Sequence, residues 1–258
     1  MSLNGMDSCF AGFFPFHEFN GLQKQCYSAA YQSNRNLIIS APTSSGKTVI
    51  FELATLRNIK DNPGTLAVYL GPTKALCSER YRDWAPRFRS IGAVCLEVTG
   101  DAPLDLRQII KANLLVTTPE KLDSLTRSFM SQLKKPLRLL MVDELHIIGE
   151  DRGAALEALV TRWKTVNPDL RIVCASATLS NIDQLARWLK DTQGPAITKV
   201  FRQRESQLTV RVQGFLKEGS PFHFESSLTR HAKGIVAEQD PKTNILIVCS
   251  LFLISVVL

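Results

Sequence analysis

The sequence predicts an α/β domain, with a mainly parallel β-sheet covered by helices on both faces. Short apolar runs of strand length alternate with helical segments, which is the order typical of parallel strands joined by crossover helices. Three polar motifs follow directly after apolar runs, and ligands gather at the carboxyl ends of parallel strands. With 258 residues and 45% hydrophobic content, the chain can bury the core of one large domain, or of one domain and part of another.

The elements follow from apolar periodicity. Residues 1–18 show no period and are interpreted as an N-terminal extension, whereas Leu22, Cys26 and Ala29 recur at helical spacing and predict a helix at 19–32. The predicted strands are 37–39, 65–70, 93–98, 114–117, 137–142 and 171–175. The predicted helices between them include 49–59, 74–89 and one opened by Thr118-Pro119, with the proline in the first turn.

Beyond residue 198 the alternation of strands and helices ends. We therefore place a domain boundary near residue 200, with the ordered core at 19–198 and a polar connection at 199–243. One strand-like piece, 208–212, lies in this connection, and residues 244–249 begin a new apolar strand. The organisation predicted is thus one complete domain followed by the start of a second.

The charge of the chain favours a polyanionic partner. The formal net charge is +7 and the pI is near 9.2, which favours nucleic acid, although a charge of this size also occurs where a protein only needs solubility. Within helix 74–89 we interpret Arg80, Arg82, Arg87 and Arg89 as a solvated face, with direct contact to DNA as the alternative.

The cysteines and the two ends of the chain indicate the cellular compartment in which the protein would reside. The six cysteines form no C-x-x-C pair and several lie in apolar runs, so they are predicted to be reduced core residues of an intracellular protein. No secretory signal is predicted, because no basic segment precedes an apolar one at the start. The apolar residues 245–258 are fewer than the roughly 20 of a spanning helix, so a buried strand with a tail is predicted and a membrane is not.

The loop Ala41-Pro42-Thr43-Ser44-Ser45-Gly46-Lys47-Thr48 predicts a phosphate site, since it joins a strand to a helix. Its backbone N–H groups, at Thr43, Ser44, Ser45 and Gly46, would meet phosphate oxygens beside the positive end of the helix. Lys47 would reach the terminal phosphates, and Thr48 would place its hydroxyl on Mg²⁺. Ala41 stands where the common pattern has its first glycine, and the alternative is a Gly/Ser turn with an exposed lysine.

The acidic pair Asp143-Glu144 follows a buried apolar strand directly. In a nucleotide-hydrolysing site Asp143 would hold magnesium through water and Glu144 would take a proton from the attacking water; the alternative is a helix cap beside a solvated acid. His146 is either a satisfied polar residue or a link to the turn Ser176-Ala177-Thr178. The sequence lacks the Asn-Lys-x-Asp expected of a guanine-specific protein, so ATP is the predicted nucleotide.

Taken in order, these motifs resemble the first motor lobe of superfamily-two DExH-box helicases, a RecA-like P-loop domain. Finer detail at Phe19-Asn20, Trp84 and Asp123-Ser124 is similar to the meiotic crossover branch of DNA helicases, the Mer-type, Ski-like enzymes. The resemblance covers roughly residues 10–250. The motifs that carry it are Gln23, Ala41 to Thr48, Pro72-Thr73-Lys74-Ala75-Leu76, Thr99-Gly100-Asp101, Thr117-Thr118-Pro119-Glu120-Lys121, Asp143-Glu144-Leu145-His146 and Ser176-Ala177-Thr178.

The resemblance implies an ATP-driven translocase that moves 3′ to 5′ on single-stranded or branched DNA, in the nucleus, during meiotic recombination. Gln23 would read the adenine, and Ser176 and Thr178 would couple hydrolysis to movement. Pro72, Thr73 and Lys74, together with Thr117, Thr118 and Pro119, would hold the sugar-phosphate backbone, which suits sequence-independent contacts from loops at strand ends.

The same resemblance implies that a second RecA-like lobe is needed for activity, because the family supplies its arginine fingers from there. Residues 244–250 look like the opening strand of that lobe, whereas the apolar tail 251–258 matches nothing in the family and reads as a truncated product. We therefore expect ATP binding without effective turnover from these residues alone. The alternatives are an ATP- and DNA-binding fragment without catalysis and an RNA helicase of similar build.

Overall fold

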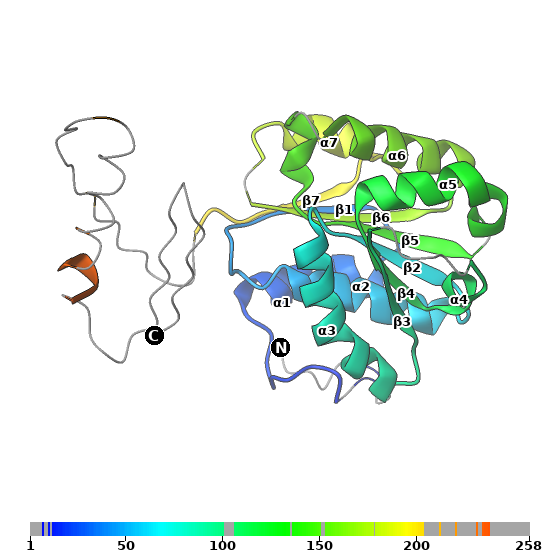
Figure 1. The fold of residues 1–258 in the computed structure, drawn as a ribbon, viewed down its shortest axis with the longest axis horizontal. Helices are drawn as coiled ribbons and strands as arrows, with labels where there is room; N and C mark the ends of the chain where they lie inside the picture. Colours follow the sequence, from blue (N-terminus) through cyan, green and yellow to red (C-terminus); the bar gives the residue numbers. More distant parts are fainter. Residues whose placement is uncertain are drawn as a thin grey trace. The chain divides into compact units, whose positions relative to one another are not determined.

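The computed structural model describes residues 7, 10, 12–100, 106–134, 136–150, 153–177, 179–203, 212, 220, 231 and 234–237. The chain divides into two compact units, Met1–Gln207 and Leu208–Leu258, and the elements below belong to the first (Figure 1). The strand predicted at 244–249 and all of the predicted piece 208–212 except Val212 lie outside the described residues. The division of the chain into a core, a connection and the start of a second lobe therefore stays a prediction.

The centre of the first unit is a seven-stranded sheet in which every strand pair is parallel. The order across the sheet is β3-β4-β2-β5-β6-β1-β7. The strands are β1 Leu37–Ser40, β2 Leu66–Leu70, β3 Cys95–Val98, β4 Leu114–Thr117, β5 Leu137–Val142, β6 Arg171–Ser176 and β7 Ile197–Val200. Almost every residue of the five inner strands is buried, as expected for a parallel sheet with both faces covered.

Helices cover both faces of the sheet (Figure 1). One face packs against α1 Gly21–Tyr27, the π-helical η3 Ser28–Gln32, α2 Thr48–Asp61 and α3 Lys74–Ser90. The other packs against α4 Leu106–Lys111, α5 Pro119–Lys134, the 3₁₀-helical η4 Leu145–Gly149, α6 Gly153–Val166 and α7 Ile182–Trp188. Successive strand residues alternate between the two cores: Ile39 and Tyr69 face α2, whereas Ile38 and Val68 face the opposite layer.

The α/β class with a sheet covered on both faces is confirmed, and all six predicted strands are present within two residues of their predicted bounds. One strand was missed. Residues Ile197–Val200, placed in part within the polar connection, form β7 and pair with β1 in parallel. This strand is short, lies at the sheet edge and is only partly buried, so it lacks the apolar run that marks the inner strands.

The interpretation of the arginines on α3 as a solvated face is wrong for Arg87. Its guanidinium makes two hydrogen bonds to the buried carboxylate of Glu52 on α2, Nη1 to Oε1 at 2.7 Å and Nη2 to Oε2 at 2.9 Å. Trp84 Nε1 donates to the same carboxylate at 2.8 Å. The ring of Phe13 lies against the guanidinium at 4.6 Å, so this cluster joins α2, α3 and the residues before α1.

Within the described residues, the cysteines are buried and reduced, as the sequence predicts. Four cysteines (Cys26, Cys77, Cys95 and Cys174) are buried and carry free thiols. Among the helices that the structure describes, none combines the length and apolar character required to cross a bilayer.

Candidate functional site

The predicted motifs line up along the carboxyl edge of the sheet. Following the strand order from β4 to β1, this edge carries the loops after Thr117, Leu70, Val142, Ser176 and Ser40. The two loops predicted to hold nucleic acid are therefore neighbours, after β4 and β2. The phosphate loop after β1, the acidic pair after β5 and the predicted coupling turn after β6 lie on the same edge, so both predicted sites share one side of the sheet.

The phosphate loop closes around its own lysine. Lys47 is buried, and its Nζ donates to the carbonyls of Ala41 at 2.7 Å and Pro42 at 2.9 Å. Burial lowers the pKa of Lys47, while the nearby carboxylates of Glu144 and Asp143 act against that shift. Ser44 and Gly46 both have positive φ, 63° and 83°, which gives the loop the left-handed turns of an anion-binding nest.

Helix α1 supports this loop from the side. Asn20 caps α1, and its Nδ2 donates to the carbonyl of Ser45 at 3.0 Å. Gln23 is buried, and its Nε2 lies 3.4 Å from the carbonyl of Gly46. A Cβ at Gly46 would lie 2.5 Å from that nitrogen, so a side chain here would displace the amide of Gln23, and the positive φ of 83° independently favours glycine. The structure thus places Gln23 against the phosphate loop, and its role toward adenine stays a prediction.

Asp143 is held by two hydrogen bonds at the end of β5. Its Oδ2 accepts from the hydroxyl of Tyr69 at 2.6 Å, and its Oδ1 accepts from the backbone N–H of Glu144 at 3.0 Å. Glu144 itself has left-handed backbone angles, φ 52° and ψ 51°, an uncommon conformation for a non-glycine residue that is concentrated at functional sites. The two adjacent carboxylates therefore lie in different surroundings: that of Asp143 accepts two hydrogen bonds, whereas one oxygen of Glu144 is buried without one among the described residues.

His146 joins the acidic pair to the end of β6. Its Nδ1 lies 3.1 Å from the hydroxyl of Ser176 and 3.3 Å from Glu144 Oε2. That carboxylate oxygen is buried, and among the described residues no group forms a hydrogen bond with it. The carbonyl of Ser176 accepts from the backbone N–H of Ala41 at 3.0 Å. The structure thus shows a contact between His146 and the end of β6, whereas the role of His146 in linking the two motifs stays a prediction; Thr178 lies outside the described residues.

The predicted nucleic-acid loops are tied to each other. The thiol of Cys77 on α3 donates to the carbonyl of Thr117 at 3.2 Å, and the backbone N–H of Gly71 donates to the same carbonyl at 3.0 Å. Thr73 caps α3 by accepting from the N–H of Leu76, and both Thr73 and Lys74 are exposed. Lys74 thus places an exposed positive charge in the first turn of α3.

The loop after β4 is more enclosed than the loop after β2. Thr117 is fully buried and donates its hydroxyl to the carbonyl of Val98 at 2.6 Å, and the hydroxyl of Thr118 accepts from the N–H of Lys121. Pro119 is the first residue of α5. The threonine hydroxyls therefore stabilise the loop, and nucleic-acid contacts of Pro72, Thr73, Lys74, Thr117, Thr118 and Pro119 stay predictions.

The chemistry of this edge fits a magnesium-bound nucleoside triphosphate. Hydroxyl and carboxylate oxygens, as on Thr48 and Asp143, are the ligand types that Mg²⁺ prefers. A helix of 14 residues, α2, begins at Thr48 with no side chain capping its N-terminus, so its positive end faces the loop. The N–H groups of Val49 and Ile50 donate to the carbonyls of Gly46 and Lys47. The buried oxygen of Glu144 without a hydrogen bond is an acceptor suited to a proton from water.

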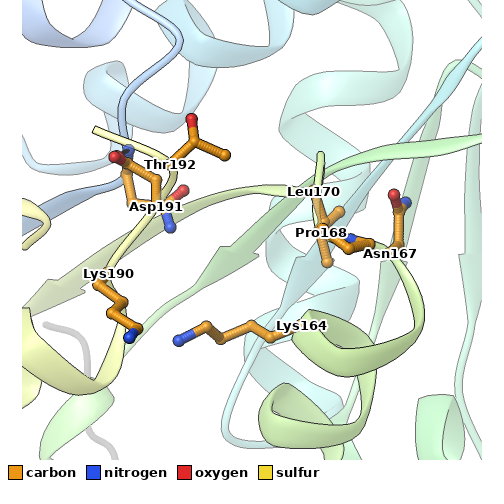
Figure 2. A pocket seen from close by; sticks show the side chains of 8 residues that line it. Lys164, Asn167, Pro168, Leu170, Lys190, Asp191 and Thr192 are labelled. Atoms are coloured by element: carbon orange, nitrogen blue, oxygen red, sulfur yellow. Dashed lines mark hydrogen bonds between the residues drawn. The ribbon is translucent and has the colours of Figure 1, made fainter. Parts of the chain in front are cut away.

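A separate cavity lies at the opposite, amino edge of the sheet (Figure 2). Lys164 and Lys190 point toward one another across it, and Asn36, Asn167 and Asp191 also line it. Lys164 donates to the carbonyl of Trp188 at the end of α7, Asn36 Nδ2 donates to Leu189, and Asp191 pairs with Arg35. Lys164 thus ties α6 to the end of α7, and Asn36 ties the residue after α7 to the start of β1, a structural role remote from the motifs.

The sequence analysis assigned no role in the site to two residues that the structure places there. Asn20 holds the phosphate loop, and its signal is the capping box Asn20-Gly21-Leu22-Gln23, an Asn with a Gln three residues later. Tyr69 holds Asp143, and its signal is a hydroxyl in the otherwise aliphatic strand Leu66-Ala67-Val68-Tyr69-Leu70, since a buried tyrosine hydroxyl requires a partner.

Comparison with known proteins agrees with this geometry. The family model described as DEAD/DEAH box helicase matches residues 20–185. The chain is 44% identical over 225 residues to the ATP-dependent DNA helicase MER3 of Saccharomyces cerevisiae, a match that covers 83% of this chain and 19% of the yeast protein. It is 38% identical over 243 residues to the probable ATP-dependent DNA helicase HFM1 of Homo sapiens, covering 85% of this chain and 17% of the human protein.

The fold has a counterpart among solved structures. The crystal structure of the DUF1998 helicase MrfA aligns with a TM-score of 0.69 and 20% sequence identity, over 95% of this chain and 38% of that one. At this identity the likeness concerns the fold. In all three comparisons the chain spans well under half of the length of the protein that it matches.

Proposed function

Since the chain belongs to the DEAD/DEAH box helicase family, we propose that it is the ATP-binding motor lobe of a DNA helicase. In this proposal the lobe binds ATP with Mg²⁺ on the half of the edge formed by β1, β6 and β5. The single observation that carries it is the hydrogen-bonded chain from Ala41 through Ser176 to His146, which joins the phosphate loop to the acidic pair. Such a connection is what a site needs if the nucleotide state is to be transmitted to other loops.

Each residue of the nucleotide site has a defined task in the proposal. Lys47 exchanges its bonds to the loop carbonyls for the β and γ phosphates, and the N–H groups of Ser44, Ser45 and Gly46 add neutral donors. Thr48 and Asp143 would hold Mg²⁺, which when bound would supply positive charge at the phosphate oxygens. Glu144 accepts a proton from the attacking water at its buried oxygen. Gln23 contacts the adenine, and to do so its side-chain amide must break its contact with the carbonyl of Gly46.

The first prediction tests nucleotide capture. Lys47→Ala removes the one side-chain charge aimed at the terminal phosphates but leaves the backbone nest, so ATP affinity is expected to fall by about 1.5–3 kcal/mol, the scale of a charged hydrogen bond. Titration calorimetry with ATP and Mg²⁺ measures the change. The control is Lys190→Ala, an exposed lysine at the amino edge. Equal affinity for ATP in wild type and Lys47→Ala would show that the loop is not a phosphate site.

For the other half of the edge we propose sequence-independent contacts to single-stranded DNA. Lys74 is exposed at the start of α3, and the loops after β2 and β4 are fixed side by side through Cys77 and Gly71. The proposed preference for DNA over RNA rests on the similarity to relatives that are named as DNA helicases. Movement from 3′ to 5′ and a meiotic role in the nucleus are proposed from the resemblance of the motifs to the meiotic crossover branch. Competition between DNA and RNA oligomers of equal length distinguishes an RNA helicase from this proposal.

We further propose that residues 1–258 alone bind ATP and turn it over slowly. The family resemblance assigns the positive charge at the γ phosphate to a second RecA-like lobe, and removal of such a finger lowers the rate about 10³–10⁵-fold. Weak binding of single-stranded DNA with little DNA-stimulated hydrolysis is therefore expected in a steady-state ATPase assay. Unwinding of a 3′-tailed duplex by this chain, with Lys47→Ala inactive in the same assay, would contradict the proposal.

A further inference from the structure

We propose that Tyr69 is a positioning residue for the magnesium carboxylate of Asp143, an inference that rests on the proposed function. The hydroxyl of Tyr69 donates to Asp143 Oδ2 at 2.6 Å. The distance is typical of an O–H donor to an ionised acceptor, the stronger class of hydrogen bond. Among the described residues, it is the side chain of Tyr69 that donates to the predicted metal-holding carboxylate.

The donor is rigid. Tyr69 is fully buried in β2, and its ring packs edge-on against Phe51 of α2, with centroids 5.6 Å apart, and against Trp84 of α3, with centroids 5.0 Å apart. Its Cα is in register with Met141, two residues before Asp143 on the neighbouring strand. Because two helices and a strand pair fix the ring, the hydroxyl is delivered to one point at the end of the sheet.

Without the Tyr69 hydroxyl, the carboxylate of Asp143 would be poorly restrained. The terminal torsion of an aspartate is broad, so a carboxylate with one anchored oxygen can still rotate. In Asp143 the N–H of Glu144 anchors Oδ1, and Tyr69 anchors Oδ2. With both oxygens engaged the carboxylate plane is set, and each oxygen keeps a lone pair for the water shell of a cation. Groups that orient metal-binding carboxylates in this way contribute about 10–100-fold to metal affinity.

The position of the ring also connects the two predicted sites. Trp84 lies on α3, the helix that begins with Lys74 at the nucleic-acid loops, and Phe51 lies on α2, which begins at the phosphate loop. Tyr69 therefore contacts the helices behind both sites while its hydroxyl contacts Asp143. The alternative role is that of a core tyrosine whose hydroxyl only finds a partner at the sheet edge.

The test separates these roles by magnesium dependence. Binding of a fluorescent, non-hydrolysable ATP analogue to the 258-residue chain is measured while Mg²⁺ is varied. For Tyr69→Phe the half-saturating Mg²⁺ concentration is expected to rise about ten-fold, with affinity in the absence of Mg²⁺ unchanged. Phe keeps the ring contacts, so folding is expected to be preserved. On an Asp143→Asn background, Tyr69→Phe is expected to add no further shift.

The matched control is Tyr31→Phe. Tyr31 is also a buried tyrosine whose hydroxyl donates to an aspartate, Asp7, but it lies on η3 away from the sheet edge. It is expected to leave the Mg²⁺ midpoint unchanged. An unshifted midpoint for Tyr69→Phe, or an equal loss of affinity with and without Mg²⁺, would overturn this inference alone. Absence of Mg²⁺-dependent binding by the wild-type chain would overturn the proposed function together with the inference.

Discussion

Glu144→Gln is expected to lower ATP hydrolysis about 10²–10⁴-fold, the contribution typical of a general base. The measurement requires a longer protein that carries a second RecA-like lobe, with hydrolysis followed at saturating single-stranded DNA. The amide has the shape of the carboxylate, and the left-handed backbone of Glu144 is equally accessible to Gln, so the turn is expected to persist. ATP affinity is expected to remain within about two-fold, because the metal ligand in the proposal is Asp143 and not Glu144.

The matched control for this substitution is Glu150→Gln, an exposed acid six positions further along the chain. It changes the same functional groups and net charge but lies outside the predicted motif, so hydrolysis is expected to be unaffected. A Glu144→Gln protein that hydrolyses ATP at the wild-type rate would exclude this carboxylate as the base. A protein that no longer binds ATP would instead show that Glu144 supports the phosphate loop.

Arg87→Ala is expected to destabilise the first unit by about 3 kcal/mol, because it leaves the buried carboxylate of Glu52 without its charged partner. Burial raises the pKa of Glu52, and the hydrogen bonds and charge of Arg87 act against that shift. The truncation also removes the guanidinium that packs on Phe13. For a domain of this size the melting temperature is expected to fall by about 6–12 °C, measured by circular dichroism at pH 7.

The control is Arg89→Ala on the same helix. Arg89 is exposed, and surface substitutions of this kind change stability by about 0.5 kcal/mol or less. A second variant, Arg87→Met with Glu52→Gln, removes both charges and is expected to recover much of the loss, because a neutral pair carries no unpaired buried charge. An unchanged melting temperature for Arg87→Ala would mean that Glu52 does not rely on this partner.

Much of the fold is determined by the sequence itself. Inner strands such as Leu114–Thr117 and Leu137–Val142 have the predicted bounds, because a strand buried on both faces must be a continuous apolar run. The phosphate loop and the acidic pair were also predicted from local pattern alone, since each consists of polar residues placed directly after such a run. Strand β7 was not predicted, because an edge strand that is only partly buried does not need a continuous apolar run.

Side-chain partners across long sequence separations were decided by the tertiary structure. Helical spacing indicates which residues share the face of α3, but the partner of Arg87 is Glu52, 35 positions earlier on another helix. Tyr69 and Asp143 are 74 positions apart, and Asn20 and Ser45 are 25 apart. Such pairs depend on which strands and helices become neighbours, and this information is absent from any local window of sequence.

The sequence by itself determined that this chain carries a phosphate loop, an acidic pair and two polar loops, each at the end of a parallel strand. Only the tertiary structure decided their order along the edge, because the strand order β4-β2-β5-β6-β1 differs from the chain order. That order puts the loops after Leu70 and Thr117 side by side and joins Ala41, Ser176 and His146 by contacts. The physical reason is that a parallel sheet fixes the direction of its strands, whereas helix packing and crossover connections select which strands become neighbours.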